Sequence, residues 1–118
     1  MKKVLITGGL GFLGVHCIEK WKELGWDITA LDNFSSNTIF PDHEICNGVS
    51  VIVKDFLDYK WKWGDNFDLI IHLASPVGPV GVLKHSGKMS KMIIDDIHHA
   101  IEGSLFSDCP LLFVSTSE

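Results

Sequence analysis

The chain has 118 residues, of which 46% are hydrophobic, and it carries a formal net charge of −5. This composition predicts one globular domain with a core of modest size. The chain has no basic stripe that could replace the counterions of a phosphate backbone, which argues against a nucleic-acid partner. No apolar stretch reaches the roughly 20 residues of a membrane span.

The cysteines and the N-terminal residues indicate the compartment. Cys17, Cys46 and Cys109 lie far apart and are odd in number, which favours free thiols over a disulfide framework. Glycine interrupts the first apolar run almost at once, so we expect no signal peptide. Both features predict a cytoplasmic protein with reduced thiols.

The first third of the chain predicts a strand, a helix and a second strand. Residues 4–7 are a short apolar run, and residues 13–24 place apolar side chains on one helical face. Gly25 then offers a left-handed C-cap. Residues 27–31 form the second apolar run, so the pattern is β, α, β.

The remainder of the chain continues this alternation. Strands are predicted at 49–53, 69–73 and 111–115, and a long helix at 82–102. Near-continuous hydrophobic strands indicate a parallel sheet that is covered on both faces by crossover helices. We therefore expect an α/β fold in three layers, α/β/α, with a doubly wound parallel sheet that stops after about five strands. The side of the long helix predicted to be apolar carries Met89, Met92, Ile93, Ile97 and Ile101.

Glycines cluster where the first strand gives way to the helix. A sharp turn at this point lets a pyrophosphate approach the N-terminal N–H groups of the helix without meeting a side chain. Gly8 and Gly11 permit the turn and the close approach, and Gly14 lets the helix pack tightly. The alternative is an ordinary tight loop, because glycine-rich turns also occur without a ligand.

Polar residues at the ends of later strands support the ligand interpretation. Asp32 ends the second strand about 20 residues beyond the glycines, where a carboxylate can accept hydrogen bonds from the ribose hydroxyls of an adenosine. The same carboxylate would repel a 2′-phosphate, which favours NAD over NADP. As an alternative, Asp32 and Asn33 are a simple turn-forming pair. Asp55 and the exit at residues 73–75 fall on the same carboxyl edge of the sheet.

Five motifs carry a family resemblance that spans nearly the whole chain. In order, "TGGLGFLG", "LDNFSS", "KDF", "HLASP" and "VSTSE" resemble the extended branch of the short-chain dehydrogenase/reductase superfamily, the NAD-dependent epimerase/dehydratases. "HLASP" with "STSE" is most similar to UDP-glucuronate decarboxylases, with 4,6-dehydratases and 4-epimerases as close relatives. The resemblance implies that residues 1–118 are the N-terminal, NAD-binding part of a Rossmann-type enzyme.

The resemblance also assigns roles along the NAD molecule. It implies a phosphate turn with helix N–H groups on the pyrophosphate, a carboxylate on the adenosine ribose with two neighbours, an adenine edge, and a strand exit beneath the nicotinamide half. The residues implied, in that order, are Gly8, Gly11, Phe12, Leu13 and Gly14; Asp32, Asn33 and Ser35; Asp55 and Phe56; and Leu73, Ala74 and Ser75.

In this family the reaction begins with oxidation of a sugar at C4, with the hydride going to NAD and the proton to a tyrosinate. By resemblance, Thr116 hydrogen-bonds the sugar oxygen, and Ser117 and Glu118 assist the second step. An Asp-Glu pair would suit a dehydratase better than Ser117 and Glu118, so the resemblance favours decarboxylation or epimerisation. As an alternative, "STSE" is a plain strand end with small polar residues.

The tyrosine that the family requires has no match in this chain. The family places a Tyr-x-x-x-Lys pair on the helix after the fifth strand, whereas the one tyrosine here, Tyr59, is followed four residues later by Trp63. The family's sugar-nucleotide domain, which follows the fifth strand, also has no counterpart. We therefore expect an N-terminal piece of a larger enzyme that binds NAD without turnover. A non-catalytic dinucleotide-binding regulatory module is the alternative function.

Several further patterns have a simpler interpretation. The pairs His98-His99 and His43-x-x-Cys46 could suggest a metal, but neither has a second matching pair, so we expect solvated or capping roles and no metal. A buried, hydrogen-bonded histidine is expected at His72. The alternating "YKWKW" stretch predicts an amphipathic connector. By resemblance, a homodimer through the long helix is expected, and a nucleotide sugar is the substrate of the full-length enzyme.

Overall fold

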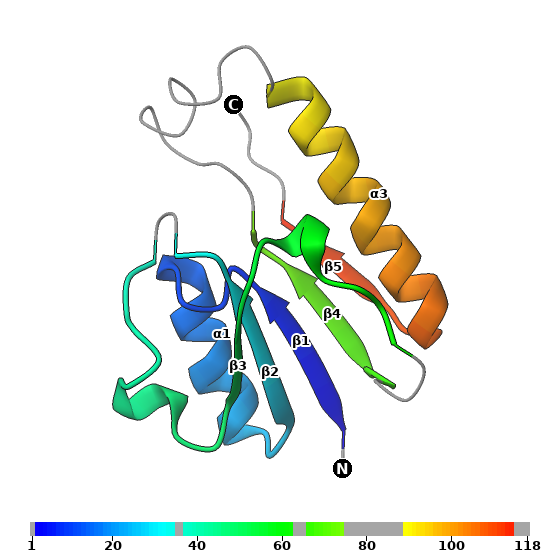
Figure 1. The fold of residues 1–118 in the computed structure, drawn as a ribbon. Helices are drawn as coiled ribbons and strands as arrows, with labels where there is room; N and C mark the ends of the chain where they lie inside the picture. Colours follow the sequence, from blue (N-terminus) through cyan, green and yellow to red (C-terminus); the bar gives the residue numbers. More distant parts are fainter. Residues whose placement is uncertain (1, 35–36, 63–65, 75–88, 115–118) are drawn as a thin grey trace.

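The computed structural model describes residues 2–34, 37–62, 66–74 and 89–114. Their strands form one parallel sheet in the order β3-β2-β1-β4-β5 (Figure 1). Chain order runs outward from β1 in both directions, which confirms the doubly wound α/β fold. The elements are β1 (Lys3–Thr7), α1 (Phe12–Glu23), β2 (Asp27–Asp32), the 3-10 turn η1 (Glu44–Cys46), β3 (Ser50–Val53), the 3-10 turn η2 (Phe56–Asp58), β4 (Leu69–His72), α3 (Met89–Ser107) and β5 (Leu111–Phe113).

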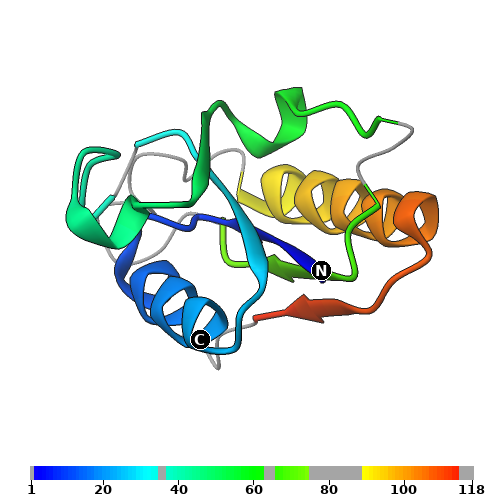
Figure 2. The same ribbon diagram turned by 90° about the horizontal axis from the view of Figure 1, so that it is seen from below.

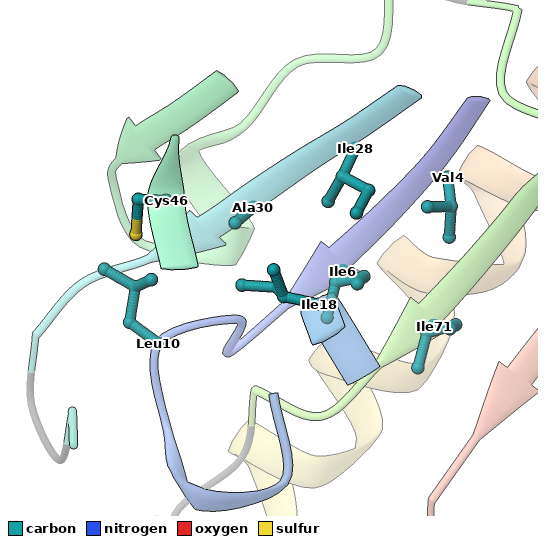
Figure 3. Close-up of a cluster of buried hydrophobic side chains, with 8 residues drawn as sticks. All are labelled: Val4, Ile6, Leu10, Ile18, Ile28, Ala30, Cys46 and Ile71. Carbon is teal, nitrogen blue, oxygen red and sulfur yellow. The ribbon is translucent and has the colours of Figure 1, made fainter. Parts of the chain in front are cut away.

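Two hydrophobic cores lie on opposite faces of the sheet. Successive side chains of a strand point to opposite faces, so Val4 and Ile6 of β1 join the core beneath α1, whereas Leu5 joins the core beneath α3. Figure 2 shows the two helices on opposite sides of the sheet. The core on the α1 side, drawn in Figure 3, comprises Val4, Ile6, Leu10, Ile18, Ile28, Ala30, Cys46 and Ile71.

Helix α1 ends as the sequence predicts. Gly25 has a φ of +81°, a conformation that glycine adopts at little cost. Its N–H donates to the carbonyl of Lys22, and the N–H of Trp26 donates to the carbonyl of Trp21, both at 3.0 Å. These bonds satisfy carbonyls of the last turn, so the chain can leave the helix directly into β2.

The two outer strands are less buried than their sequences predict. β3 has only β2 as a neighbour, and Val53 is exposed. β5 pairs only with β4, and Leu112 and Phe113 are also exposed. The third strand is nevertheless packed on both faces, as expected, because Val51 joins the core on the α1 side and Ile52 joins the core on the α3 side. The expected end of the fifth strand at Ser115 lies outside the described residues.

The described part of α3 buries a face next to the one predicted. Its buried residues include Asp96, Ala100 and Gly103, whereas Ile97 is half-buried and Ile101 is 45% exposed. Trp61 packs against this buried face so closely that a Cβ on Gly103 would lie 2.2 Å from its ring. The start predicted at 82 and the side chains of Met89, Met92 and Ile93 lie outside the described residues. No helix in the described ranges is long and apolar enough to span a bilayer.

The connector from η2 to β4 fastens α3 to the sheet. Tyr59 is buried and Trp61 half-buried, whereas Lys60 and Lys62 are exposed, which confirms the amphipathic alternation. The Trp61 Nε1–H donates to the carbonyl of His99 at 3.2 Å, and Nε2 of His99 lies 2.6 Å from the carbonyl of Tyr59. These bonds link the connector to α3.

Candidate functional site

The glycine turn after β1 leaves the first N–H groups of α1 open. Gly8 has a φ of +67°, and its carbonyl accepts the Gly11 N–H at 3.1 Å. Gly11 is the N-cap of α1 and has no side chain to bond the first turn. The N–H groups of Phe12, Leu13 and Gly14 therefore have no acceptor within the helix, and such a terminus favours an anion.

Gly14 is required by contact with the turn itself. A Cβ at this position would lie 2.4 Å from the carbonyl oxygen of Gly8 and 2.5 Å from the carbonyl carbon of Gly9. Sequence reasoning did not assign a role to Gly9, yet a Cβ there would meet the Cβ of Ala30 on β2 at 2.8 Å. The absence of a side chain at Gly9 lets the turn pack against the sheet, and its absence at Gly14 lets α1 pack against the turn.

Asp32 joins this turn to the exit of β2. The side chain is only 6% exposed, and its two oxygens accept the backbone N–H groups of Leu10 at 3.0 Å and Phe34 at 2.8 Å. The carbonyl of Leu10 in turn accepts the N–H groups of Thr38 and Ile39. A carboxylate has about four lone-pair sites, so Asp32 retains capacity for further donors such as hydroxyls. Leu10 is a residue of the site that sequence reasoning missed.

The exits of β2 and β3 also meet. The Asn33 Nδ2–H donates to a carboxylate oxygen of Asp55, and the Lys54 N–H donates to the carbonyl of Asp32 at 3.1 Å. Phe56 follows Asp55 and is buried under α3. Phe34 has a φ of 64°, which is unusual for a residue with a side chain. Ser35, predicted beside them, lies outside the described residues.

The exit of β4 is fastened to the end of β1 through Thr7. The Thr7 hydroxyl oxygen lies 3.0 Å from the N–H of Leu73 and 3.2 Å from that of Ala74. It also lies 2.7 Å from Nδ1 of His72. His72 is buried and hydrogen-bonded, as expected, and burial, with a smaller contribution from His99, lowers its pKa to about 4. Thr7 was not identified from the sequence, and Ser75 lies outside the described residues.

Helix α3 adds an unexpected acid to this region. Asp96 is 9% exposed, and burial, followed by repulsion from Asp95 and Asp55, raises its pKa to about 6. Asp96 belongs to none of the sequence motifs and is not part of an apolar pattern, so the sequence alone did not indicate that it would be buried. Its electrostatic coupling to Asp55 places a second carboxyl near the predicted adenine edge.

The remaining predicted residues are placed as follows. Thr116, Ser117 and Glu118 lie outside the described residues. His43 accepts the N–H of Ile45 and caps η1, which confirms its capping role, and His98 is exposed. The expectation is wrong for His99, which is half-buried and bonded to the carbonyl of Tyr59. In the described part of the chain, no group of three or more His, Cys, Asp or Glu side chains is arranged to hold a metal ion.

The strand order and the glycine turn at the β1–β4 switch point define a Rossmann-type α/β domain. Residues 4–116 match the model of the NAD dependent epimerase/dehydratase family. The chain belongs to this family, which confirms the resemblance carried by the five motifs.

Curated relatives include both decarboxylases and epimerases. The UDP-N-acetyl-alpha-D-glucosaminuronate decarboxylase of Bacillus cytotoxicus is 28% identical over 99% of this chain and 37% of its own length. A putative UDP-glucose 4-epimerase of Methanocaldococcus jannaschii is 36% identical over 63% of this chain and 24% of its own length. The chain thus spans 37% of the first relative's length and 24% of the second's.

Solved structures have the same fold. A UDP-galactose 4-epimerase is 26% identical with a TM-score of 0.77, over 98% of this chain and 38% of that one. The UDP-glucose 4-epimerase from Bifidobacterium longum in complex with NAD+ and UDP has a TM-score of 0.82 at 17% identity, over 98% of this chain and 37% of that one. At such low identity the second match shows the fold alone.

Proposed function

We propose that this chain is the cofactor-binding, N-terminal part of an NAD-dependent enzyme that modifies a nucleotide sugar. The observation that carries the proposal is the junction at the carboxyl edge, where Asp32 bonds the glycine turn and the exits of β2, β3 and β4 lie around the β1–β4 switch point. Ligands of open α/β sheets bind at such a point. The family and the printed names of the relatives support the same class.

The residues present fit NAD. Gly8 and Gly14 allow the turn to close against the exit of β4 and against the start of α1, and the N–H groups of Phe12 and Leu13, which have no acceptor within the helix, can bind the pyrophosphate. Asp32 would accept the hydroxyls of the adenosine ribose. The amide of Asn33 bonds the Asp55 carboxylate and holds it for the exocyclic amine of adenine.

The other assignments extend along the cofactor. When bound, NAD would supply a hydride acceptor for the C4 position of the sugar. Leu73 and Ala74, with Ser75, would lie beneath the nicotinamide half. Thr116 would hydrogen-bond the sugar oxygen, and Ser117 and Glu118 would assist a decarboxylation or an epimerisation. We place the enzyme in the cytoplasm and assign its substrate to the UDP-sugars that the relatives' names contain.

A non-catalytic dinucleotide-binding module is a second candidate, and one observation favours it. Tyr59, the one tyrosine of the chain, is 6% exposed and lies under α3 with its carbonyl against His99. A phenol in that position cannot reach a sugar at the carboxyl edge. Within the described residues this tyrosine therefore offers no base for a sugar hydroxyl, as expected of a non-catalytic module.

Titration calorimetry with NAD and NADP tests the proposal. We expect NAD to bind and NADP to bind at least about tenfold more weakly, because a 2′-phosphate would face the buried carboxylate of Asp32. Equal affinity for the two cofactors would contradict the role of Asp32. Binding of neither would reject the cofactor assignment as a whole.

A further inference from the structure

The hydroxyl of Thr7 uses its whole hydrogen-bonding capacity. A threonine hydroxyl has one proton to donate and two lone pairs that accept. The N–H groups of Leu73 and Ala74, at 3.0 and 3.2 Å, occupy the lone pairs. The proton is therefore directed at Nδ1 of His72, which lies at 2.7 Å. His72 must accept at Nδ1, so the proton of its neutral ring is on Nε2.

The ring of His72 is held by its surroundings. The residue is 1% exposed. Its ring stacks on Phe113 with ring centroids 5.6 Å apart and lies tilted against Phe56 with centroids 4.6 Å apart. Burial keeps the ring neutral, since it lowers the pKa to about 4. Nε2 has no hydrogen-bond partner among the described residues. Among the described residues this N–H has no acceptor, and an aliphatic side chain would fill the same volume without that cost, so packing alone does not explain the imidazole.

The glycine turn touches the same segment that Thr7 holds. Gly8 follows Thr7, and a Cβ on Gly8 would lie 3.0 Å from both the backbone nitrogen of Ala74 and the carbonyl carbon of Leu73. Leu73 also donates to the Thr7 carbonyl at 3.1 Å. One hydroxyl thus sets the separation between the β1 exit, where a pyrophosphate would lie, and the β4 exit beneath the nicotinamide half.

We propose that His72 is a positioning residue for dinucleotide binding, because it orients the Thr7 hydroxyl that fixes the exits of β1 and β4 relative to each other. This inference rests on the proposed function of the same edge. It assigns to His72 no contact with the ligand. Its effect should therefore be larger for a ligand that spans both exits than for one that occupies the adenosine end alone.

Four variants separate positioning from packing. His72→Asn keeps an acceptor near the place of Nδ1, and His72→Leu removes it; Thr7→Ser keeps the hydroxyl, and Thr7→Val removes it. Calorimetry with NAD and AMP should show NAD binding weakened about tenfold in His72→Leu and Thr7→Val. We expect AMP binding to change less than about threefold, with NAD binding largely retained in the Asn and Ser variants. The double variant, Thr7→Val with His72→Leu, should bind NAD no more weakly than either single variant, because both substitutions remove the same hydrogen bond between the two side chains.

The imidazole spectrum of the unmodified chain is a second readout that does not depend on a variant folding. Nitrogen-15 NMR should show the neutral Nε2–H tautomer from about pH 5 to pH 8. An Nδ1–H tautomer, or a ring that titrates near its ordinary value of about 6.5, would overturn the proposal. So would a folded His72→Leu variant that binds NAD as tightly as the unmodified chain. Failure of the unmodified chain to bind NAD would reject the proposed function itself, and with it the positioning role.

Discussion

The Asp32 carboxylate accepts a hydrogen bond of 3.0 Å from the backbone N–H of Leu10, 22 residues earlier in the sequence. Its other oxygen accepts the N–H of Phe34 at 2.8 Å. The residue expected to hold a ribose thus also builds the turn that would hold the pyrophosphate. Ligand recognition and local folding therefore depend on the same side chain.

Replacement of Asp32 by alanine should affect stability as well as binding. The variant leaves the N–H groups of Leu10 and Phe34 without an acceptor, so we expect the free energy of unfolding to fall by about 2–3 kcal/mol. Urea denaturation followed by circular dichroism measures this. Asp42→Ala, at an exposed position, is the matched control and should change stability by less than about 0.5 kcal/mol. Equal losses in the two variants would contradict the structural role of Asp32.

Gly14 should not tolerate even one methyl group. In Gly14→Ala the new Cβ would lie 2.4 Å from the carbonyl oxygen of Gly8, and backbone cannot move aside as a flexible side chain can. We expect NAD affinity to fall by at least about tenfold, because the turn must open. In Gly25→Ala the Cβ meets nothing within 4 Å, so the positive φ should cost about 1–2 kcal/mol of stability while NAD affinity is unchanged. If calorimetry showed the same NAD affinity in both variants, the assignment of Gly14 to the phosphate-binding turn would be refuted.

Local sequence patterns predicted the sheet and the glycine turn because strand burial and left-handed turns leave a direct mark on residue type. Gly25 and Gly8 are examples, since both have a positive φ. The buried face of α3 could not be predicted in this way. Its hydrophobic period suggested Ile101, but the residue that packs on Trp61, about 40 residues earlier in the sequence, is Gly103. Thr7 was missed for a related reason, since its three partners are brought together only by the pairing of β1 with β4.

Asp96 should make stability depend on pH. Its folded pKa of about 6 lies above the ordinary value of about 3.9, so the native chain holds a proton that the unfolded chain releases. Stability should therefore fall as the pH rises from about 4 to about 6, and the loss is complete above that range. In Asp96→Asn we expect the free energy of unfolding at pH 7.5 to be about 1–3 kcal/mol higher than in the unmodified chain. It should also change less with pH between pH 4 and 6. Asp58→Asn, on an exposed position, should leave the profile unchanged, and a parallel response of the two variants would contradict this account.

The contact between Gly103 and Trp61 should be sensitive to any added volume. A Cβ on Gly103 would lie 2.2 Å from the indole ring, so Gly103→Ala should lower the free energy of unfolding by about 1–3 kcal/mol. The gain in helix propensity, about 1 kcal/mol, does not offset this overlap. With Trp61 replaced by leucine, the same Gly103→Ala change should cost much less, because the overlapping ring is gone. Thermal unfolding of the unmodified chain, the two single variants and the double variant measures this difference. If the effects of the two substitutions on stability simply added, the contact would be unimportant.

Exposed apolar side chains on α3 favour association with a second copy of the chain. Ile94, Ile101 and Leu105 recur at helical spacing and are exposed, Leu105 by 76%. An apolar row of this kind is unusual on a monomer surface, and the family resemblance also implied a dimer through this helix. Sedimentation velocity over a range of concentrations should show dimers of the unmodified chain.

In the double variant Ile101→Glu with Leu105→Glu the dimer should dissociate, since two carboxylates from each copy would be buried without partners. Leu24→Glu, at an exposed position at the end of α1, is the control and should leave association unchanged. A monomer at the highest concentration, or a dimer that survives the double variant, would rule out this surface as the interface.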